Sequence, residues 1–122
     1  MPQAIVWIFL FTSSLFAAVH NFAVATSLYW YYWWFDVFMH FWGGILVVVG
    51  VYALCSLKHV PLKPTAILIF TTLGIAMFAW EVFEWKIGLS NPQYGLFDTI
   101  KDLLMGISGG LVGYFSALRL RM

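Results

Sequence analysis

Four stretches of about 20 mostly apolar residues occupy most of the chain and constrain its fold more than any other feature. They run from about residue 4 to 25, 35 to 57, 65 to 86 and 98 to 118. A helix needs about 20 such residues to cross the hydrocarbon core of a bilayer. The sequence therefore predicts an all-α integral membrane bundle of four transmembrane helices, forming one domain over residues 1–122.

Charged residues are scarce, at 9% of the 122 residues, against about 25% in a soluble domain. Such a chain cannot cover a surface that faces water, which excludes a soluble enzyme. It has no basic face to neutralise phosphates, which excludes nucleic acid as a partner. The single cysteine, Cys55, excludes an internal disulfide and a cysteine-based zinc site. We expect membrane lipid to be the main partner.

Polar, turn-forming segments separate the later helices. Two prolines and two lysines interrupt the apolar sequence at 58–64, and a turn-rich segment at 88–95 precedes the fourth helix. The aromatic segment at 29–35 fits a belt at the membrane surface or extra length of the second helix. Four basic residues lie on the side of the termini and two on the other side, so the positive-inside rule predicts cytoplasmic termini.

Every acidic residue is predicted to lie at the outer end of a helix, opposite the termini. The polar residues there form three pairs, spaced by three or four residues so that both members share one helix face. These pairs are Asp36 with His40, Glu81 with Glu84, and Asp98 with Asp102.

Small residues continue these faces toward the other end of each helix. They are Gly43 and Gly44 in the second helix, Gly74 in the third, and Gly106, Gly110 and Gly113 in the fourth. Small residues let helices approach closely in lipid. We therefore expect the acidic faces to pack together, so that the acids converge in one polar mouth. The same glycine faces could also hold a homo-oligomer together.

Five carboxylates and two lysines at one level leave a net charge of −3 there. Like charges this close require either protonated carboxyls or a bound cation. The predicted metal ligands are Asp36, His40, Glu81, Asp98 and Asp102. Oxygen ligands with one imidazole suit Mg²⁺, Mn²⁺ or Ca²⁺, and Zn²⁺ stays open.

Several of these residues also have a simpler explanation. Asp98 precedes the predicted fourth helix and could serve only as its N-cap. Glu84 could reach the interface and pair with a lysine. Lys101 could bind a phosphate or neutralise an acid, while His20 and Asn21 are further candidates for contacting a substrate.

Three segments together resemble a known family: residues 36–44, 81–85 and 94–102, with Gly109 seven residues later. Their order and spacing are similar to the VanZ-like integral membrane proteins, in particular the YjdF-type branch. The resemblance implies a prokaryotic plasma membrane and chemistry on a lipid head group. It also implies an active site formed by Asp36, His40, Glu81, Glu84, Asp98 and Asp102. Many members carry Asn where this chain has Gly106, and Asn21 could supply that amide.

Three functions fit these observations. The first is a lipid head-group enzyme that catalyses phosphoryl transfer or hydrolysis, in which His40, Glu81, Glu84 and Asp102 are the catalytic candidates. The second is a protein that binds or transports a cation or small solute, although no ionisable residue lies in the inner half of any predicted helix. The third is a structural subunit of a membrane complex.

Overall fold

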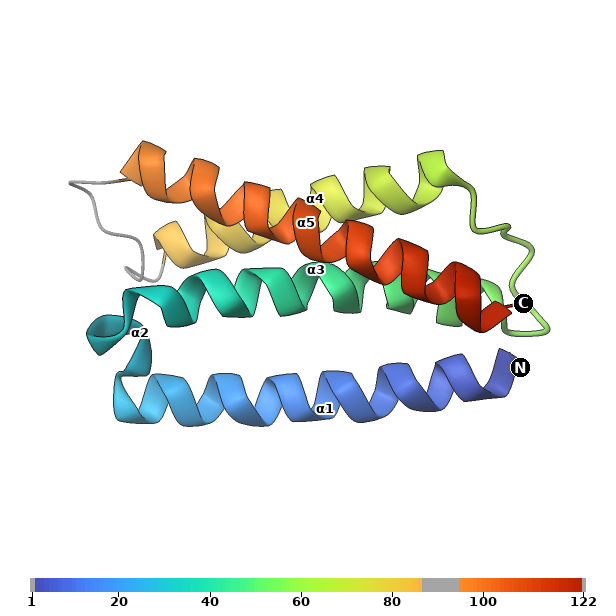
Figure 1. The fold of residues 1–122 in the computed structure, drawn as a ribbon, viewed down its shortest axis with the longest axis horizontal. Coiled ribbons are helices and arrows are strands. Elements are labelled where there is room, and N and C mark those ends of the chain that lie inside the picture. The colour runs from blue at the N-terminus through green and yellow to red at the C-terminus, as the bar shows by residue number, and fades with distance from the viewer. Residues whose placement is uncertain (1, 87–94, 122) are drawn as a thin grey trace.

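A computed structural model describes residues 2–86 and 95–121, and over these residues the regular structure is helical. The four long helices are α1 (Pro2–Thr26), α3 (Trp33–Cys55), α4 (Ala66–Lys86) and α5 (Gly95–Arg121), and α2 (Leu28–Tyr31) is one short turn. They form a bundle with both ends of the chain at one end and α2 at the other (Figure 1). This arrangement confirms the predicted all-α fold with four long helices. Most of the predicted turn-rich segment at 88–95 lies outside the described residues.

Three of the helices are long and apolar enough to span a membrane: residues 4–26 of α1, 34–55 of α3 and 66–86 of α4. The 27 residues of α5 extend for about 40 Å at about 1.5 Å per residue, which makes a fourth span plausible. Large apolar side chains also cover the outside of the bundle; among the most exposed are Trp7, Phe11, Ile67, Phe78 and Phe115. A surface of this kind suits lipid rather than water.

The ends of the helices follow from local chemistry. Thr65, directly after Pro64, caps α4, since its Oγ1 accepts a hydrogen bond of 3.2 Å from the backbone N–H of Leu68. In contrast, α5 begins at Gly95, three residues earlier than predicted. Asp98 therefore lies inside the first turn of α5, and its interpretation as the N-cap is wrong.

The connection between α1 and α3 turns at two residues. Ser27 ends α1 in the left-handed conformation, with φ 61° and ψ 33°, and Tyr32 is extended between α2 and α3. The aromatic segment is thus a helical turn followed by the start of α3. Tyr31, Tyr32 and Trp34 are exposed at this end of the bundle, where an aromatic belt would meet the membrane surface.

The closest packing in the bundle lies between α3 and α5. A Cβ added at Gly44 would overlap the backbone carbonyl of Gly106, and one added at Gly109 would overlap that of Phe41. The two backbones are therefore in direct contact, as the small-residue faces predicted. This contact fixes the rotation of α5 and turns Asp102 toward α3.

The buried face of α4 changes from apolar to acidic along its length. Ile69, Leu73 and Met77 are buried in the main core, and Glu81 and Glu84 continue the same buried face. The prediction that Gly74 lies on this buried face is wrong, because no neighbouring atom lies within 4 Å of the position that a Cβ would take at this residue. Gly74 is the next residue after buried Leu73, and successive residues of a helix point about 100° apart.

Candidate functional site

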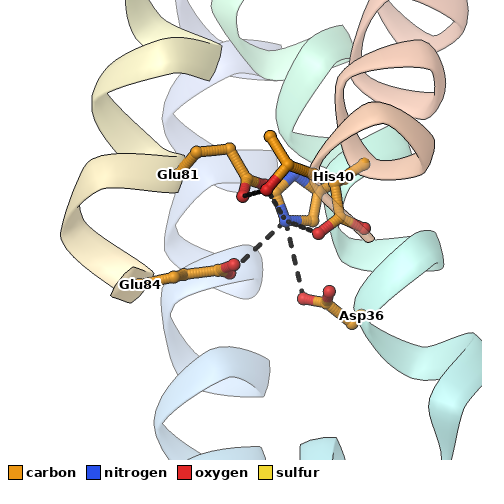
Figure 2. A network of polar contacts seen from close by, with 6 residues as sticks. Asp36, His40, Glu81 and Glu84 are labelled. Carbon is orange, nitrogen blue, oxygen red and sulfur yellow. Dashed lines mark hydrogen bonds and ion pairs between the residues drawn. The ribbon is translucent and has the colours of Figure 1, made fainter. Parts of the chain in front are cut away.

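His40 is the centre of a buried polar cluster at the α2 end of the bundle (Figures 1 and 2). Its side chain is 1% exposed. Its Nε2 atom lies within 3.3–3.5 Å of carboxylate oxygens from four residues, namely Asp36, Glu81, Glu84 and Asp102. The nearest of these oxygens is Oε1 of Glu84, at 3.3 Å. Side chains from α3, α4 and α5 therefore meet around one nitrogen atom.

Each helix brings its residues to this point by simple periodicity. Asp36 and His40 are one turn apart on α3, and Glu81 and Glu84 are three residues apart on the buried face of α4. Asp102 lies one turn before Gly106, where α5 approaches α3 most closely. The packing that forms the apolar core therefore also forms the cluster.

Aromatic packing holds the imidazole ring of His40. The indole of Trp80 stacks on it, with ring centroids 4.1 Å apart and planes inclined by 17°. Phe16 of α1 presents its edge to Trp80 at 5.8 Å. Gly43 leaves room for the indole, because a Cβ added there would overlap the ring of Trp80. The ring plane of His40 is thus constrained, and Nε2 is held toward the carboxylates.

Thr99 of α5 orients one of the carboxylates. Its hydroxyl donates a hydrogen bond of 3.3 Å to Oε2 of Glu81. The other oxygen of Glu81, Oε1, is buried without a hydrogen-bond partner among the described residues, as are Oδ1 of Asp102 and Nε2 of His40. Buried polar atoms in proteins are nearly always satisfied, so these three atoms could contact a bound ligand, although Nε2 of His40 and Oε1 of Glu81 also face each other at 3.5 Å.

The cluster is closed on most sides. The side chains of Glu81, Glu84 and Asp102 are at most 9% exposed, whereas that of Asp36 is 21% exposed. Asp36 lies in the first turn of α3, near the exposed aromatic residues. Asp36 is therefore the most exposed of the four carboxylates.

The ligand atoms have the spacing of a coordination sphere. Asp36, His40, Glu84 and Asp102 each offer one atom, and these atoms all lie within 4.8 Å of one another. Around an ion with bonds of about 2.4 Å, neighbouring ligands of an octahedron are about 3.4 Å apart and opposite ligands about 4.8 Å. These four residues could therefore hold a divalent cation of the size of Ca²⁺, and a small inward movement of the carboxylates would suit Mg²⁺ or Mn²⁺.

The structure brings together five of the residues singled out from the sequence: Asp36, His40, Glu81, Glu84 and Asp102. Glu84 is buried, 5% exposed, and its Oε1 lies 3.3 Å from Nε2 of His40, so the alternative that it reaches out to the interface is wrong. One of its carboxylate oxygens belongs to the group of possible ligand atoms, whereas Glu81 was the residue predicted for that role on this helix.

The ligand group does not include the other predicted residues whose side chains the structure describes, namely His20, Asn21 and Lys101. Asn21 is exposed on α1, and His20 is half-buried there and contributes no atom to the ligand group. Lys101 is half-buried beside Asp102 in the chain. The side chain of Asp98 lies outside the described part of the structure.

Trp80 and Thr99 contact the cluster but were not predicted as members of it. A signal for Thr99 was present, since it precedes Asp102 by three residues and shares its helix face. Trp80 precedes Glu81 directly, and only the packing of α4 against α3 places its ring on His40.

A family model describes almost the whole chain. Residues 2–122 match the model of DUF2238, a family of predicted membrane proteins. The chain belongs to this family. Searches of curated proteins and of solved structures found no match. The family's description agrees with the apolar helices.

Proposed function

We propose that the cluster binds a divalent cation and uses it to act on the phosphate-bearing head group of a membrane lipid. One observation carries the proposal: Nε2 of His40 lies within 3.3–3.5 Å of carboxylates from three helices. Burying several acids around an imidazole is costly unless a cation compensates them. A bundle without such a role would have apolar side chains at these positions.

The bound cation would supply the chemistry that the carboxylates cannot. A divalent ion polarises a phosphoryl oxygen and turns a bound water into a nucleophile near neutral pH. Asp36, His40, Glu84 and Asp102 would hold the ion. The stack of Trp80 on His40 would keep the imidazole in the orientation that binding requires.

The position of the cluster favours a lipid substrate. It lies at the end of the bundle where Tyr31, Tyr32 and Trp34 are exposed, the level at which aromatic residues meet head groups. Lys101, next to Asp102 in the chain, supplies a positive charge near the cluster for a phosphate. The resemblance of residues 36–44, 81–85 and 94–102 to VanZ-like proteins also supports head-group chemistry.

Transport of a cation across the membrane has less support. In α3 no charged residue follows His40 before the helix ends at Cys55, and in α5 none lies between Asp102 and Arg119. An ion that left the cluster would meet only apolar helix, where a charge is costly.

The proposal can be tested in vesicles of phospholipids labelled in the head group. The purified protein with Mn²⁺ should release a water-soluble labelled product, and Asp102→Asn should abolish the release because it removes a ligand charge. Ser108→Ala is the matched control on the same helix, since its exposed hydroxyl donates a hydrogen bond to the carbonyl of Leu104 within that helix. No product from wild-type protein that has bound Mn²⁺, across a set of head groups, would reject the proposed chemistry.

A further inference from the structure

Two buried carboxylate oxygens in the cluster have no hydrogen-bond partner among the described residues: Oε1 of Glu81 and Oδ1 of Asp102. The two residues are 8% and 1% exposed. Both carboxylates point into the cluster around His40, which Figure 2 shows for Glu81. Oε1 of Glu81 lies 3.5 Å from Nε2 of His40, whereas Oδ1 of Asp102 is not the oxygen that faces the imidazole.

Asp102 is placed to serve two ions. Its Oδ2 is the atom 3.5 Å from Nε2 of His40, so this oxygen faces the ligand group. Its Oδ1 is the buried oxygen without a partner. A carboxylate that presents one oxygen to each of two positions is suited to bridge a pair of cations.

Glu81 lies beside the ligand group without belonging to it. The hydroxyl of Thr99 engages its Oε2, at 3.3 Å. The hydrogen bond fixes the orientation of the carboxylate, and its other oxygen, Oε1, lies 3.5 Å from Nε2 of His40. Oε1 of Glu81 and Oδ1 of Asp102 are therefore two buried carboxylate oxygens without a hydrogen bond among the described residues, in the same cluster.

The charge of the cluster also indicates two ions. Four carboxylates surround a single imidazole. With all four carboxyls ionised, one divalent cation would leave two negative charges on these carboxylates, whereas two cations would balance them. Uncompensated buried charge is strongly unfavourable.

We infer that a second divalent cation binds between Glu81 and Asp102, with the carboxylate of Asp102 bridging the two ions. This inference rests on the proposed function and makes its chemistry more specific. Paired cations about 3.5–4 Å apart stabilise the attacking and leaving oxygens of an in-line displacement at phosphorus. The oxygen of a water forms a bond to phosphorus, the ester P–O bond breaks, and the proton from water ends on the leaving oxygen. The substrate class is thus a phosphate ester.

The test counts Mn²⁺ ions bound to the purified full-length protein in detergent. Elemental analysis should find two Mn per wild-type chain, and electron paramagnetic resonance should show a spin-coupled pair. Glu81→Gln should hold one Mn with the spectrum of an isolated ion. Circular dichroism and gel filtration establish that the variant is folded.

Each outcome separates the inference from the proposed function. One Mn per wild-type chain, or two uncoupled ions, overturns the second site and leaves the first intact. No bound Mn overturns both. Two coupled ions in Glu81→Gln overturn the assignment of Glu81 as a ligand of the second ion. If Glu81→Gln does not fold, Thr99→Val replaces it; this variant keeps the carboxylate, and loss of its hydrogen bond should weaken the second ion about 10- to 100-fold. If Thr99→Val bound the second Mn²⁺ ion with unchanged affinity, the inference would be contradicted.

Discussion

At the scale of single residues, the cluster depends on how one imidazole is held. His40 is one turn from Asp36 on its own helix, but its contacts with Glu81, Glu84 and Asp102 cross to two other helices. A ring free to rotate would lose these contacts, because all of them involve Nε2. The stacked indole of Trp80 restricts that rotation.

Trp80→Leu should therefore weaken Mn²⁺ binding by about 10-fold, because residues that orient a metal ligand typically contribute at least that much to metal affinity. Leucine fills part of the space but has no flat face to align the imidazole. The measurement is a Mn²⁺ titration followed by electron paramagnetic resonance. Trp85→Leu is the matched control, because Trp85 is 76% exposed on the same helix. Equal affinities of the two variants would show that the stack does not position His40.

At the scale of helices, the contact between α3 and α5 sets the geometry of the site. Gly44 faces the backbone of Gly106, and Gly109 faces that of Phe41. These contacts determine how deep and at what rotation Asp102 enters the bundle. Close packing and the site are therefore consequences of the same glycines.

Gly109→Ala should destabilise the bundle by about 1–3 kcal/mol, because the added methyl group forces two backbones apart. Gly110→Leu should do the same, since even a Cβ there would overlap the side chain of Leu73. Thermal unfolding in detergent measures the effect. Gly74→Ala is the control in open space, where the better helix propensity of alanine should leave stability equal or higher. A Gly109→Ala protein as stable as Gly74→Ala would mean that α3 and α5 are not in backbone contact.

The sequence predicted the features that depend on spacing within one helix. The pairs Asp36 with His40 and Glu81 with Glu84 share faces because of the 3.6-residue period, and the apolar lengths set the number of helices. The sequence did not predict the features that depend on how neighbouring helices are rotated against each other. The depth of Glu84 and the exposure of Gly74 follow from the rotation of α4 against its neighbours, which no local pattern encodes.

The turn at Ser27 is a second feature that the sequence did not predict, for a different reason. A left-handed backbone usually requires glycine or asparagine, and serine gives little signal for it. The extended Tyr32 has no turn signature either. The boundary between the first two long helices therefore could not be read from residue types.

At the scale of the whole molecule, the cluster lies at one end of an apolar bundle, and both termini lie near the other end (Figure 1). The loop between α3 and α4, with Lys58 and Lys63, is also at the end of the termini. The distribution of basic residues predicts that this end faces the cytoplasm. The cluster would then lie at the outer surface.

Cysteine labelling in intact cells tests this orientation, with Cys55 replaced by serine. A cysteine at Tyr31, which is 73% exposed at the cluster end, should react with a membrane-impermeant thiol reagent. A cysteine at Lys63, exposed in the opposite loop, should react only after the cells are opened. The reverse pattern would place the cluster at the cytoplasmic surface.

The central claim is that a divalent cation binds at His40, and pulsed electron paramagnetic resonance tests it most directly. Mn²⁺ bound to the wild-type protein should show the modulation of one directly coordinated imidazole nitrogen. His59→Gln, a control in the exposed loop at the opposite end, should keep the signal, and His40→Gln should lose it. Bound Mn²⁺ without nitrogen coupling in the wild type, or with coupling that persists in His40→Gln, would contradict the account.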